Sequence, residues 1–447
     1  MLTCPLDGAA ATYYVRQTVG DNANDGLSPK TAWRGIAKLS GAMKAGDTAY
    51  VGPGLYREAI TLLNAGTAES RLTLIADTTG HHTGDPPGVV MISGADPVQG
   101  DRFVPHAAPG VYVMQSARQV VGVVEMDGPQ YRYQRARDTK EHLVEKRSEL
   151  EAVEKLPSSY FYDAAARILY IHTSDGKSPS THEIELMYRA NGIVMTGKHH
   201  VTVMGFTFRH TGDAGLAFWK GAGDAIAINN TSYGSRQGIR VYTASSVLVY
   251  GNTLFRNENS GVYFVGESRN GWAIGNVAYE NVKGLRWGSQ STHGSALDNV
   301  VFDNHEAGIA LEQVDQALLR RNTIVNNTQS QLLVLTSQYR SEDNCFENGA
   351  PAQLTADFGS GIGYKTLLEY RRSKGQEVGS HEGGCGRLPT KVDVRKLHAE
   401  TTGYAERARK AISMRETDAM LAPPEPARDG AGSRAALKRC TGGGRLE

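Results

Sequence analysis

Residues 238–265 read GIRVYTASSVLVYGNTLFRNENSGVYFV, and the pattern that opens this stretch returns 23 residues later at Gly261. A glycine followed by an apolar residue recurs through the middle of the chain with steps of 23, 23, 23, 23 and 24 residues. The recurrences are Gly192-Ile193, Gly215-Leu216, Gly238-Ile239, Gly261-Val262, Gly284-Leu285 and Gly308-Ile309, and a seventh repeat starts at Gln331-Leu332. A fixed period of this length indicates a solenoid of stacked units.

The residues after each glycine alternate with the period of a β-strand. The first position is always apolar (Ile193, Leu216, Ile239, Val262, Leu285, Ile309, Leu332), and so is the third (Met195, Phe218, Val241, Phe264, Trp287, Leu311, Val334). The second and fourth positions vary freely. Leucine-rich, propeller and helical repeats require other signatures or periods. We therefore predict an all-β, right-handed parallel β-helix solenoid, in which one strand face lies in the core and the other faces solvent.

Two further columns support stacking in register. Asparagines recur at Asn230, Asn252, Asn276, Asn299 and Asn322, and again at Asn257, Asn281, Asn304 and Asn327. Aromatic residues follow the first column at Tyr233, Phe255, Tyr279 and Phe302, with Val325 last, and we expect Phe208 to begin this aromatic column. Identical side chains placed above one another can form amide ladders and ring stacks at the strand spacing.

The N-terminal region carries a family resemblance. Its motifs are Tyr13-Tyr14-Val15, the turn from Gly20 to Gly26, Thr31 to Leu39, and Gly46 to Glu58. They resemble the opening of bacterial pectate-lyase-like β-helix proteins, over about residues 12–95 and, through the repeats, 190–350. The resemblance implies a strand, a turn, a capping helix and the first coil. Ala32, Ile36, Leu39 and Met43 fit one face of such a helix, and a solenoid needs its open end covered.

The rhythm of the repeats divides the chain into five parts. We expect an N-terminal cap with the first coils at 12–99, an inserted β-rich lobe at 100–190, and the repeat coils at 191–350. A helical segment is expected at 351–422, and the tail at 423–447, rich in Pro, Gly, Ala and Arg, is expected to be disordered.

The composition of the chain limits the classes of molecule that it can bind. The net charge of +1 argues against nucleic acid and against a charged membrane surface, and no apolar run reaches the length of a membrane-spanning helix. The first residues lack the features of a signal peptide, whereas the resemblance implies an extracellular or periplasmic location.

The chain has four cysteines. Cys345 with Cys385, and Cys4 with Cys440, can form disulfides, but four free thiols remain an equal alternative. The oligomeric state is left open.

β-helix enzymes that this chain resembles place their sites on the outward face of one parallel sheet. The second positions after the glycines put Arg240, Tyr263 and Arg286 in one outward row on consecutive coils, with Trp219 and Tyr242 beside it. Aromatic rings can cover the apolar face of a sugar, and Arg can pair with a carboxylate. We therefore predict action on an acidic, uronate-containing polysaccharide, with β-elimination as the first choice.

The predicted roles follow from side-chain chemistry. Arg240 and Arg286 hold a carboxylate, and Tyr263, His293 or Lys220 transfers a proton, because arginine resists deprotonation. Trp219, Lys220 and Tyr242 contribute to substrate binding. The alternative is a purely structural role, in which the outward Arg and Tyr side chains only stabilise the surface of the sheet.

Two alternatives stay open. A glycoside hydrolase would use Glu312, the only acid on the outward columns, with a second carboxylate such as Glu267 or Asp315. A non-catalytic polysaccharide-binding module or adhesin would use the groove without chemistry. No metal ligands are predicted: lyases of this fold often use calcium, but the outward columns hold no cluster of aspartates, and the Asp21 to Gly26 run is better explained as a turn.

Overall fold

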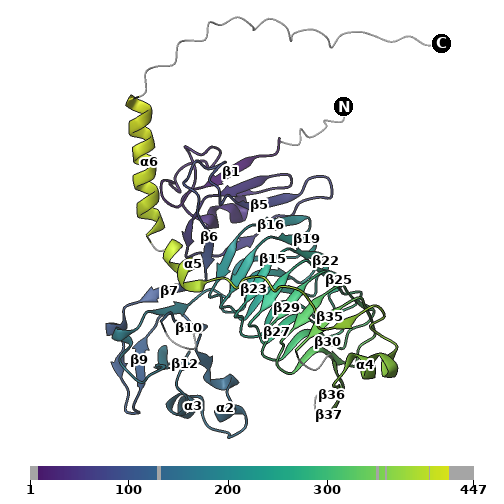
Figure 1. The fold of residues 1–447 in the computed structure, drawn as a ribbon. Helices are drawn as coiled ribbons and strands as arrows, with labels where there is room; N and C mark the ends of the chain where they lie inside the picture. The colour runs from purple at the N-terminus through teal and green to yellow at the C-terminus, as the bar shows by residue number, and fades with distance from the viewer. Residues whose placement is uncertain (1–8, 128–131, 349–351, 358–359, 402, 422–447) are drawn as a thin grey trace, which may run out of the picture.

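The computed structural model describes residues 9–127, 132–348, 352–357, 360–401 and 403–421, and its main body is a parallel β-helix of three ten-stranded sheets. Each regular coil contributes one strand to sheet C, then one to sheet A, then one to sheet B (Figure 1). The repeat coils therefore have the predicted all-β solenoid architecture. No helix in the described ranges is long and apolar enough to span a membrane.

The strands of the three sheets are as follows. Sheet A contains β1 (Thr12–Val15), β2 (Thr48–Val51), β5 (Leu72–Ala76), β16 (Val201–Met204), β19 (Gly223–Ile228), β22 (Ser245–Tyr250), β25 (Arg269–Ile274), β28 (Ser295–Leu297), β31 (Ala317–Arg320) and β34 (Tyr339–Glu342). Sheet B contains β3 (Gly54–Tyr56), β6 (Val90–Ser93), β17 (Thr207–Arg209), β20 (Thr231–Tyr233), β23 (Thr253–Phe255), β26 (Val277–Tyr279), β29 (Val300–Phe302), β32 (Thr323–Val325), β35 (Cys345–Glu347) and β38 (His381–Glu382). Sheet C contains β4 (Ile60–Leu62), β15 (Asn191–Thr196), β18 (Ala214–Trp219), β21 (Gln237–Tyr242), β24 (Ser260–Val265), β27 (Lys283–Gly288), β30 (Ala307–Glu312), β33 (Ser330–Leu335), β36 (Ala352–Asp357) and β37 (Ser360–Tyr364).

The glycine at the second position of the sheet C strands from β15 to β30 is required by close contact between coils. A Cβ on Gly238 would lie 2.5 Å from the carbonyl oxygen of Gly261, and a Cβ on Gly261 would lie 2.6 Å from that of Gly284. Any side chain at this position would therefore collide with the next coil. The apolar residues one and three positions later are buried in a single core that runs the length of the solenoid.

Two buried asparagine ladders hold the coils in register. In the first, Asn252 Nδ2 donates to Asn276 Oδ1 at 3.0 Å, and Asn276 Nδ2 donates to Asn299 Oδ1 at 3.0 Å and to the Val249 carbonyl at 2.9 Å. The ladder ends at Asn344, which donates to the buried Glu377 carboxylate at 3.0 Å. The second ladder ends where Asn327 donates to the side chain of Gln331 at 2.6 Å.

The aromatic column is present, with one correction. Tyr233, Phe255, Tyr279 and Phe302 stack with centroid spacings of 5.0, 5.0 and 5.1 Å. Phe208 does not begin this column: it lies in the central core, and its neighbour Arg209 is in register with Tyr233. Phe208 lies one residue before the position that pairs with Tyr233, and a difference of one residue along a strand places the side chain on the opposite face of the sheet.

The C-terminal segment covers this aromatic column. Leu388, Val392, Val394 and Leu397 pack on it, and Lys391 lies 5.9 Å from the centroid of the Tyr279 ring. The segment runs back along sheet B to α5 (Val394–Thr401) and α6 (Tyr404–Leu421), beside the first coils (Figure 1). Before it, the expected helical region opens with the β36–β37 hairpin, which extends the edge of sheet C, and continues with α4 (Leu367–Lys374).

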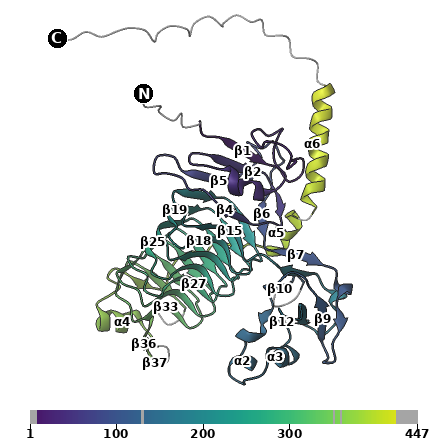
Figure 2. The same ribbon diagram turned by 180° about the vertical axis from the view of Figure 1, so that it is seen from behind.

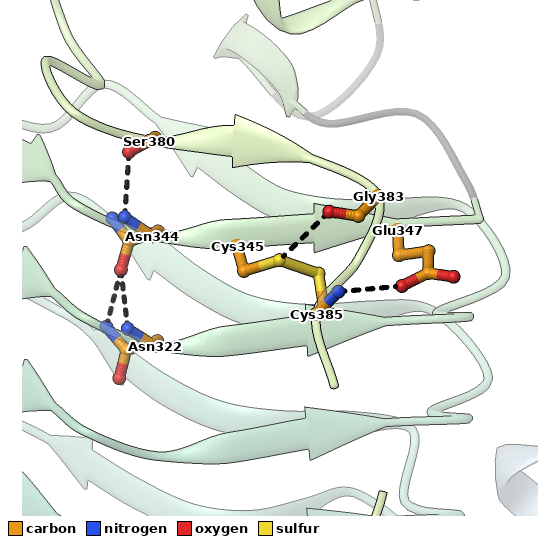
Figure 3. The surroundings of a disulfide bond; sticks show 7 residues. All are labelled: Asn322, Asn344, Cys345, Glu347, Ser380, Gly383 and Cys385. Atoms are coloured by element: carbon orange, nitrogen blue, oxygen red, sulfur yellow. Dashed lines mark hydrogen bonds between the residues drawn. A yellow bond between two sulfur atoms is a disulfide. The ribbon is translucent and has the colours of Figure 1, made fainter. Parts of the chain in front are cut away.

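A disulfide joins Cys345 to Cys385 where this segment leaves the last coils, close to the end of the first asparagine ladder (Figure 3). Cys4, Cys440 and the tail at 423–447 lie outside the described residues.

The N-terminal end differs in detail from the expected capping helix. A 3₁₀ turn, η1 (Ile36–Lys38), and a single helical turn, α1 (Leu39–Ala42), lie against β4, and Ile36, Leu39 and Met43 are buried in the solenoid core. Ala32 precedes both turns, so the helix is shorter than its apolar spacing suggested. Gly35 and Gly41 lie within this stretch, and glycine disfavours a longer helix.

A β-rich lobe is inserted between β6 and β15 and lies beside the solenoid (Figure 2). It contains a three-stranded sheet of β7 (Ala95–Val98), β10 (Gly122–Glu125) and β14 (Ile184–Met187). A five-stranded sheet contains β8 (Val104–Pro105), β9 (Val111–Gln115), β11 (Gln134–Arg135), β12 (Ser159–Asp163) and β13 (Ile168–His172). Its short helices are η2 (Gly100–Arg102), η3 (Ala136–Asp138), α2 (Lys140–Leu143), α3 (Glu149–Lys155) and η4 (Pro179–Thr181).

A buried ionic cluster ties the lobe to the solenoid. Glu185 of the lobe accepts from Arg209 at 2.9 Å and from His210 Nδ1 at 2.8 Å, and Arg57 lies 2.9 Å from it. Burial lowers the pKa of His210 to about 4. Burial alone would raise the pKa of Glu185, but the hydrogen bond from His210 and the nearby arginine charges outweigh it and leave this pKa below its usual range.

We predict that Asn276→Ala lowers the free energy of unfolding by about 3 kcal/mol, because Asn252 and the Val249 carbonyl lose buried partners. Urea unfolding followed by circular dichroism measures the change. The control Gln338→Ala removes an exposed amide and should change stability by no more than about 0.5 kcal/mol. Equal stability of the two variants would contradict a structural role for the ladder.

We predict that the protein loses stability as the pH falls from about 6.5 to 4. Below about pH 6.5 His210 takes up a proton in the unfolded chain, whereas in the folded state, where the pKa of His210 is about 4, it does not. Glu185, whose pKa is lowered in the folded state, causes a further loss of stability at lower pH. His210→Gln should flatten the dependence between pH 7 and 5, by no more than about 3 kcal/mol in total. Unfolding curves at each pH test this, with the exposed His81→Gln as control; parallel curves for wild type and His210→Gln would refute it.

Candidate functional site

The outward face of sheet C brings the predicted row together. Arg240 pairs in register with Tyr263, and Tyr263 pairs with Arg286, on the consecutive strands β21, β24 and β27. Trp219 on β18 pairs with Tyr242 on β21. Residues 23 positions apart are therefore vertical neighbours, as the period predicted.

Arg240 is held by a carboxylate and two aromatic rings. Its Nη1 donates to both carboxylate oxygens of Asp213, at 3.0 and 2.9 Å. Its guanidinium carbon lies 5.2 Å from the centroid of the Tyr242 ring and 5.8 Å from that of Trp219. Asp213 belongs to the turn before the previous strand, so the arginine side chain lies along the sheet surface. Both functional groups are only partly exposed.

Arg286 occupies the equivalent position two coils further on. Its Nε donates to Glu312 Oε2 at 2.9 Å, its Nη1 donates to Asn259 Oδ1 at 3.0 Å, and its guanidinium lies 4.3 Å from the Tyr263 ring centroid. Both arginines that were expected to hold a substrate carboxylate are thus already paired with acids of the chain.

Glu312 is the most enclosed acid on this face, with only 7% of the residue exposed. Besides Arg286, it faces Lys283, whose Nζ lies 3.7 Å from Glu312 Oε1 and 2.7 Å from Glu306 Oε2. The two acids expected as its partners, Glu267 and Asp315, share no ion-pair partner with Glu312 among the described residues. The neighbouring carboxylate is Glu306. Lys283 pairs in register with Ala307, and Glu306 immediately precedes that residue, so the repeat pattern carried a signal that was missed.

Tyr263 is placed to donate a hydrogen bond rather than to accept a proton. Burial raises the pKa of Tyr263, an effect that the Arg286 charge only partly offsets and that Glu312 adds to. Gly288, two residues after Arg286 on the next coil, leaves space there: a Cβ on it would lie 3.4 Å from Tyr263 Oη and 3.5 Å from Glu312 Oε2. The phenol and the carboxylate thus border the same opening.

Lys220 and His293 lie apart from this cluster. Both are exposed and follow the ends of sheet C strands, on the side toward sheet A, and neither side chain makes a hydrogen bond or ion pair with any residue in the described ranges. Lys220 and His293, the two alternative candidates for the catalytic base, therefore have no partner that would orient them.

A cavity of about 1140 Å³ lies at the turns between sheets B and C, between three segments that are distant in sequence. Arg132 and Asp127 of the lobe, Glu258 and Arg256 of the solenoid turns, and His398 of the C-terminal segment are among its lining residues. Arg132 lies 3.0 Å from Glu258, and Glu258 is next to Asn259, which binds Arg286. The repeat pattern could not reveal this cavity, because two of its three walls lie outside the repeats.

Comparison with known proteins agrees with the geometry. Residues 169–346 match the family described as "Right handed beta helix region". The chain therefore has the right-handed parallel β-helix fold. No curated protein matches it by sequence.

Solved structures similar to this β-helix protein share little sequence with it. A structure titled "The complex structure of XylC with xylose" has 13% identity and a TM-score of 0.57, over 77% of this chain and 68% of that one. "Rhamnogalacturonan lyase" has 11% identity and a TM-score of 0.49, over 86% and 90% of the two chains. "Crystal structure of pectate lyase Pel9A" has 11% identity and a TM-score of 0.46, over 85% and 80%. At these identities the likeness concerns the fold.

We predict that Arg286→Leu destabilises the β-helix protein by about 2 kcal/mol, because it leaves the enclosed Glu312 with only the more distant Lys283. The double variant Arg286→Leu/Glu312→Leu should recover much of this loss, since neither charge then lacks its partner. A double-mutant cycle by urea unfolding measures the coupling. Strictly additive effects would show that the pair contributes nothing.

Proposed function

We propose that this β-helix protein is an enzyme that cleaves a polysaccharide bound along the outward face of sheet C, with Glu312 at the reacting centre. The observation that carries the proposal is the enclosed Glu312 carboxylate between Arg286 and Lys283, with Glu306 on the same lysine and the Tyr263 phenol beside it.

The aromatic residues supply the binding surface. Trp219, Tyr242 and Tyr263 lie on three consecutive coils, which are spaced by about 4.8 Å. Rings at this interval can cover the apolar faces of successive sugar units. The fold shared with the xylose complex is compatible with a carbohydrate ligand.

Two carboxylates at this spacing favour glycoside hydrolysis. The distances of 2.7 and 3.7 Å from Lys283 Nζ place the Glu306 and Glu312 oxygens no more than about 6.5 Å apart, which is compatible with the roughly 5–5.5 Å separation of the two carboxyl groups in retaining glycosidases. Glu312 lies against two cations, Arg286 and Lys283, which suits its carboxylate to stabilise the anomeric carbon or to activate water. Glu306 is more exposed and has one cation, so it is the carboxyl group assigned to protonate the glycosidic oxygen as the bond breaks.

β-Elimination on a uronate is the second candidate. Arg236 favours it, because this exposed arginine lies on the turn next to Asn259 and makes no side-chain ion pair within the described ranges. It is therefore available to a substrate carboxylate, unlike Arg240 and Arg286. The difficulty is the base, since Tyr263 is held in its protonated form and Lys220 and His293 lie apart.

A location outside the cytoplasm is part of this proposal. The Cys345–Cys385 disulfide supports it, because such bonds persist in oxidising compartments.

We predict that Glu312→Gln and Glu306→Gln each lower kcat by about 10²–10⁴-fold while leaving the circular dichroism spectrum unchanged. The assay incubates the protein with neutral and uronate-containing polysaccharides and records new reducing ends together with the ultraviolet absorbance of unsaturated sugars. The control Glu342→Gln alters an acid that pairs with Arg320 and Arg340 on sheet A and should keep full activity.

The outcomes separate the alternatives. Reducing ends without unsaturated product support hydrolysis, whereas unsaturated product would transfer the assignment to β-elimination. Binding without cleavage would identify a binding module, and full activity in both glutamate variants would remove Glu312 from the reaction.

A further inference from the structure

A second group of functional side chains lies in the inserted lobe. Glu125 ends β10, Asp127 follows in the next turn, and His182 precedes β14. His182 Nδ1 lies 3.4 Å from Glu125 Oε1 and 3.3 Å from Asp127 Oδ2, and the three ligand atoms all lie within 4.8 Å of one another. Glu125 is buried and His182 is partly buried, whereas Asp127 is exposed and lines the cavity.

The imidazole ring is oriented by a fourth residue. His182 Nε2 lies 3.0 Å from Asp175 Oδ1 on the opposite side of the ring. A proton on Nε2 satisfies Asp175 and leaves the Nδ1 lone pair directed at two carboxylate oxygens. A lone pair facing two anions is unfavourable unless a cation lies between them. A carboxylate behind the imidazole is also the arrangement that orients histidine ligands in metal sites.

The two carboxylates are positioned as well. Ser174 donates to Glu125 through its backbone N–H, at 3.2 Å, and through its hydroxyl, and the Tyr133 hydroxyl also donates to Glu125. The backbone N–H of Glu183 donates to Asp127 Oδ1 at 2.9 Å, which leaves Oδ2 toward His182. Each of the three side chains therefore has a partner that fixes its orientation.

We propose that Glu125, Asp127 and His182 bind a divalent transition-metal ion of the zinc class. Ligand atoms about 2.0–2.2 Å from a tetrahedral ion lie roughly 3.3–3.5 Å from one another, and the two distances from His182 Nδ1 match these edges. An imidazole nitrogen with two carboxylate oxygens suits zinc and its neighbours, whereas calcium and magnesium prefer oxygen ligands alone.

The site has consequences for the lobe. A bound ion would join the end of β10 to the residues before β14 at the wall of the cavity, where Met126, Asp127 and Glu183 lie. Three protein ligands leave a coordination position for water or another ligand, as in zinc sites that are not purely structural. This proposal is independent of the chemistry assigned to sheet C.

The experiment uses the full chain without a histidine tag, freed of metal by EDTA and then dialysed. Zinc is titrated by calorimetry, and cobalt(II) by the visible absorption that distinguishes tetrahedral from octahedral coordination. We expect one ion per chain, a loss of affinity of at least about 100-fold in His182→Gln and Asp127→Asn, and a loss of about 10–100-fold in Asp175→Asn.

The controls make the test decisive. His81→Gln removes an exposed imidazole elsewhere and should bind zinc as the wild type does, and circular dichroism checks that each variant folds. Because Asp127 is exposed, its substitution should leave the lobe folded even if a change at His182 does not. No zinc binding by the wild type, equal binding by the wild type and Asp127→Asn, or equal affinity for calcium and zinc would overturn the proposal, since the cluster would then be a protonated histidine among carboxylates.

Discussion

The contact between equivalent positions of successive coils is the interaction on which this structure depends. Every coil is held to the next by backbone hydrogen bonds, and buried asparagine side chains continue this bonding through the turns. An amide can donate and accept at once, so each asparagine satisfies its neighbours above and below. A shift of register by one residue would break both ladders and turn core side chains outward. The 23-residue period therefore determines which side chains are neighbours on the surface.

The same vertical relation produces the charged face of sheet C. Arg240 reaches back to Asp213 on the preceding coil, and Arg286 reaches both back to Asn259 and forward to Glu312. These bonds neutralise charges that would otherwise repel along the sheet, and they preorganise the carboxylates. The enclosed acid with its cations, rather than a free arginine, is consequently the feature on which the proposed function rests.

Two segments outside the repeats complete the molecule. The C-terminal segment covers the stacked rings of sheet B, which would otherwise be an exposed aromatic surface, and the disulfide fixes its start. The inserted lobe is joined to the solenoid by the buried cluster of Glu185, Arg209 and His210. Because the lobe and the C-terminal segment both lie beside the turns between sheets B and C, the cavity has walls from all three parts of the chain.

The sequence by itself determined the solenoid, its core and the row of Arg240, Tyr263 and Arg286, because a strand repeat has one geometric solution in which equal positions stack. It also placed Trp219 and Tyr242 beside the row. Only the tertiary structure decided that both arginines are paired, that Glu306 shares Lys283 with Glu312, and that Phe208 faces the core. It alone brought Glu125, Asp127 and His182 together. Side-chain reach across coils and the packing of the lobe and C-terminal segment depend on three-dimensional distances, which no period along the chain encodes.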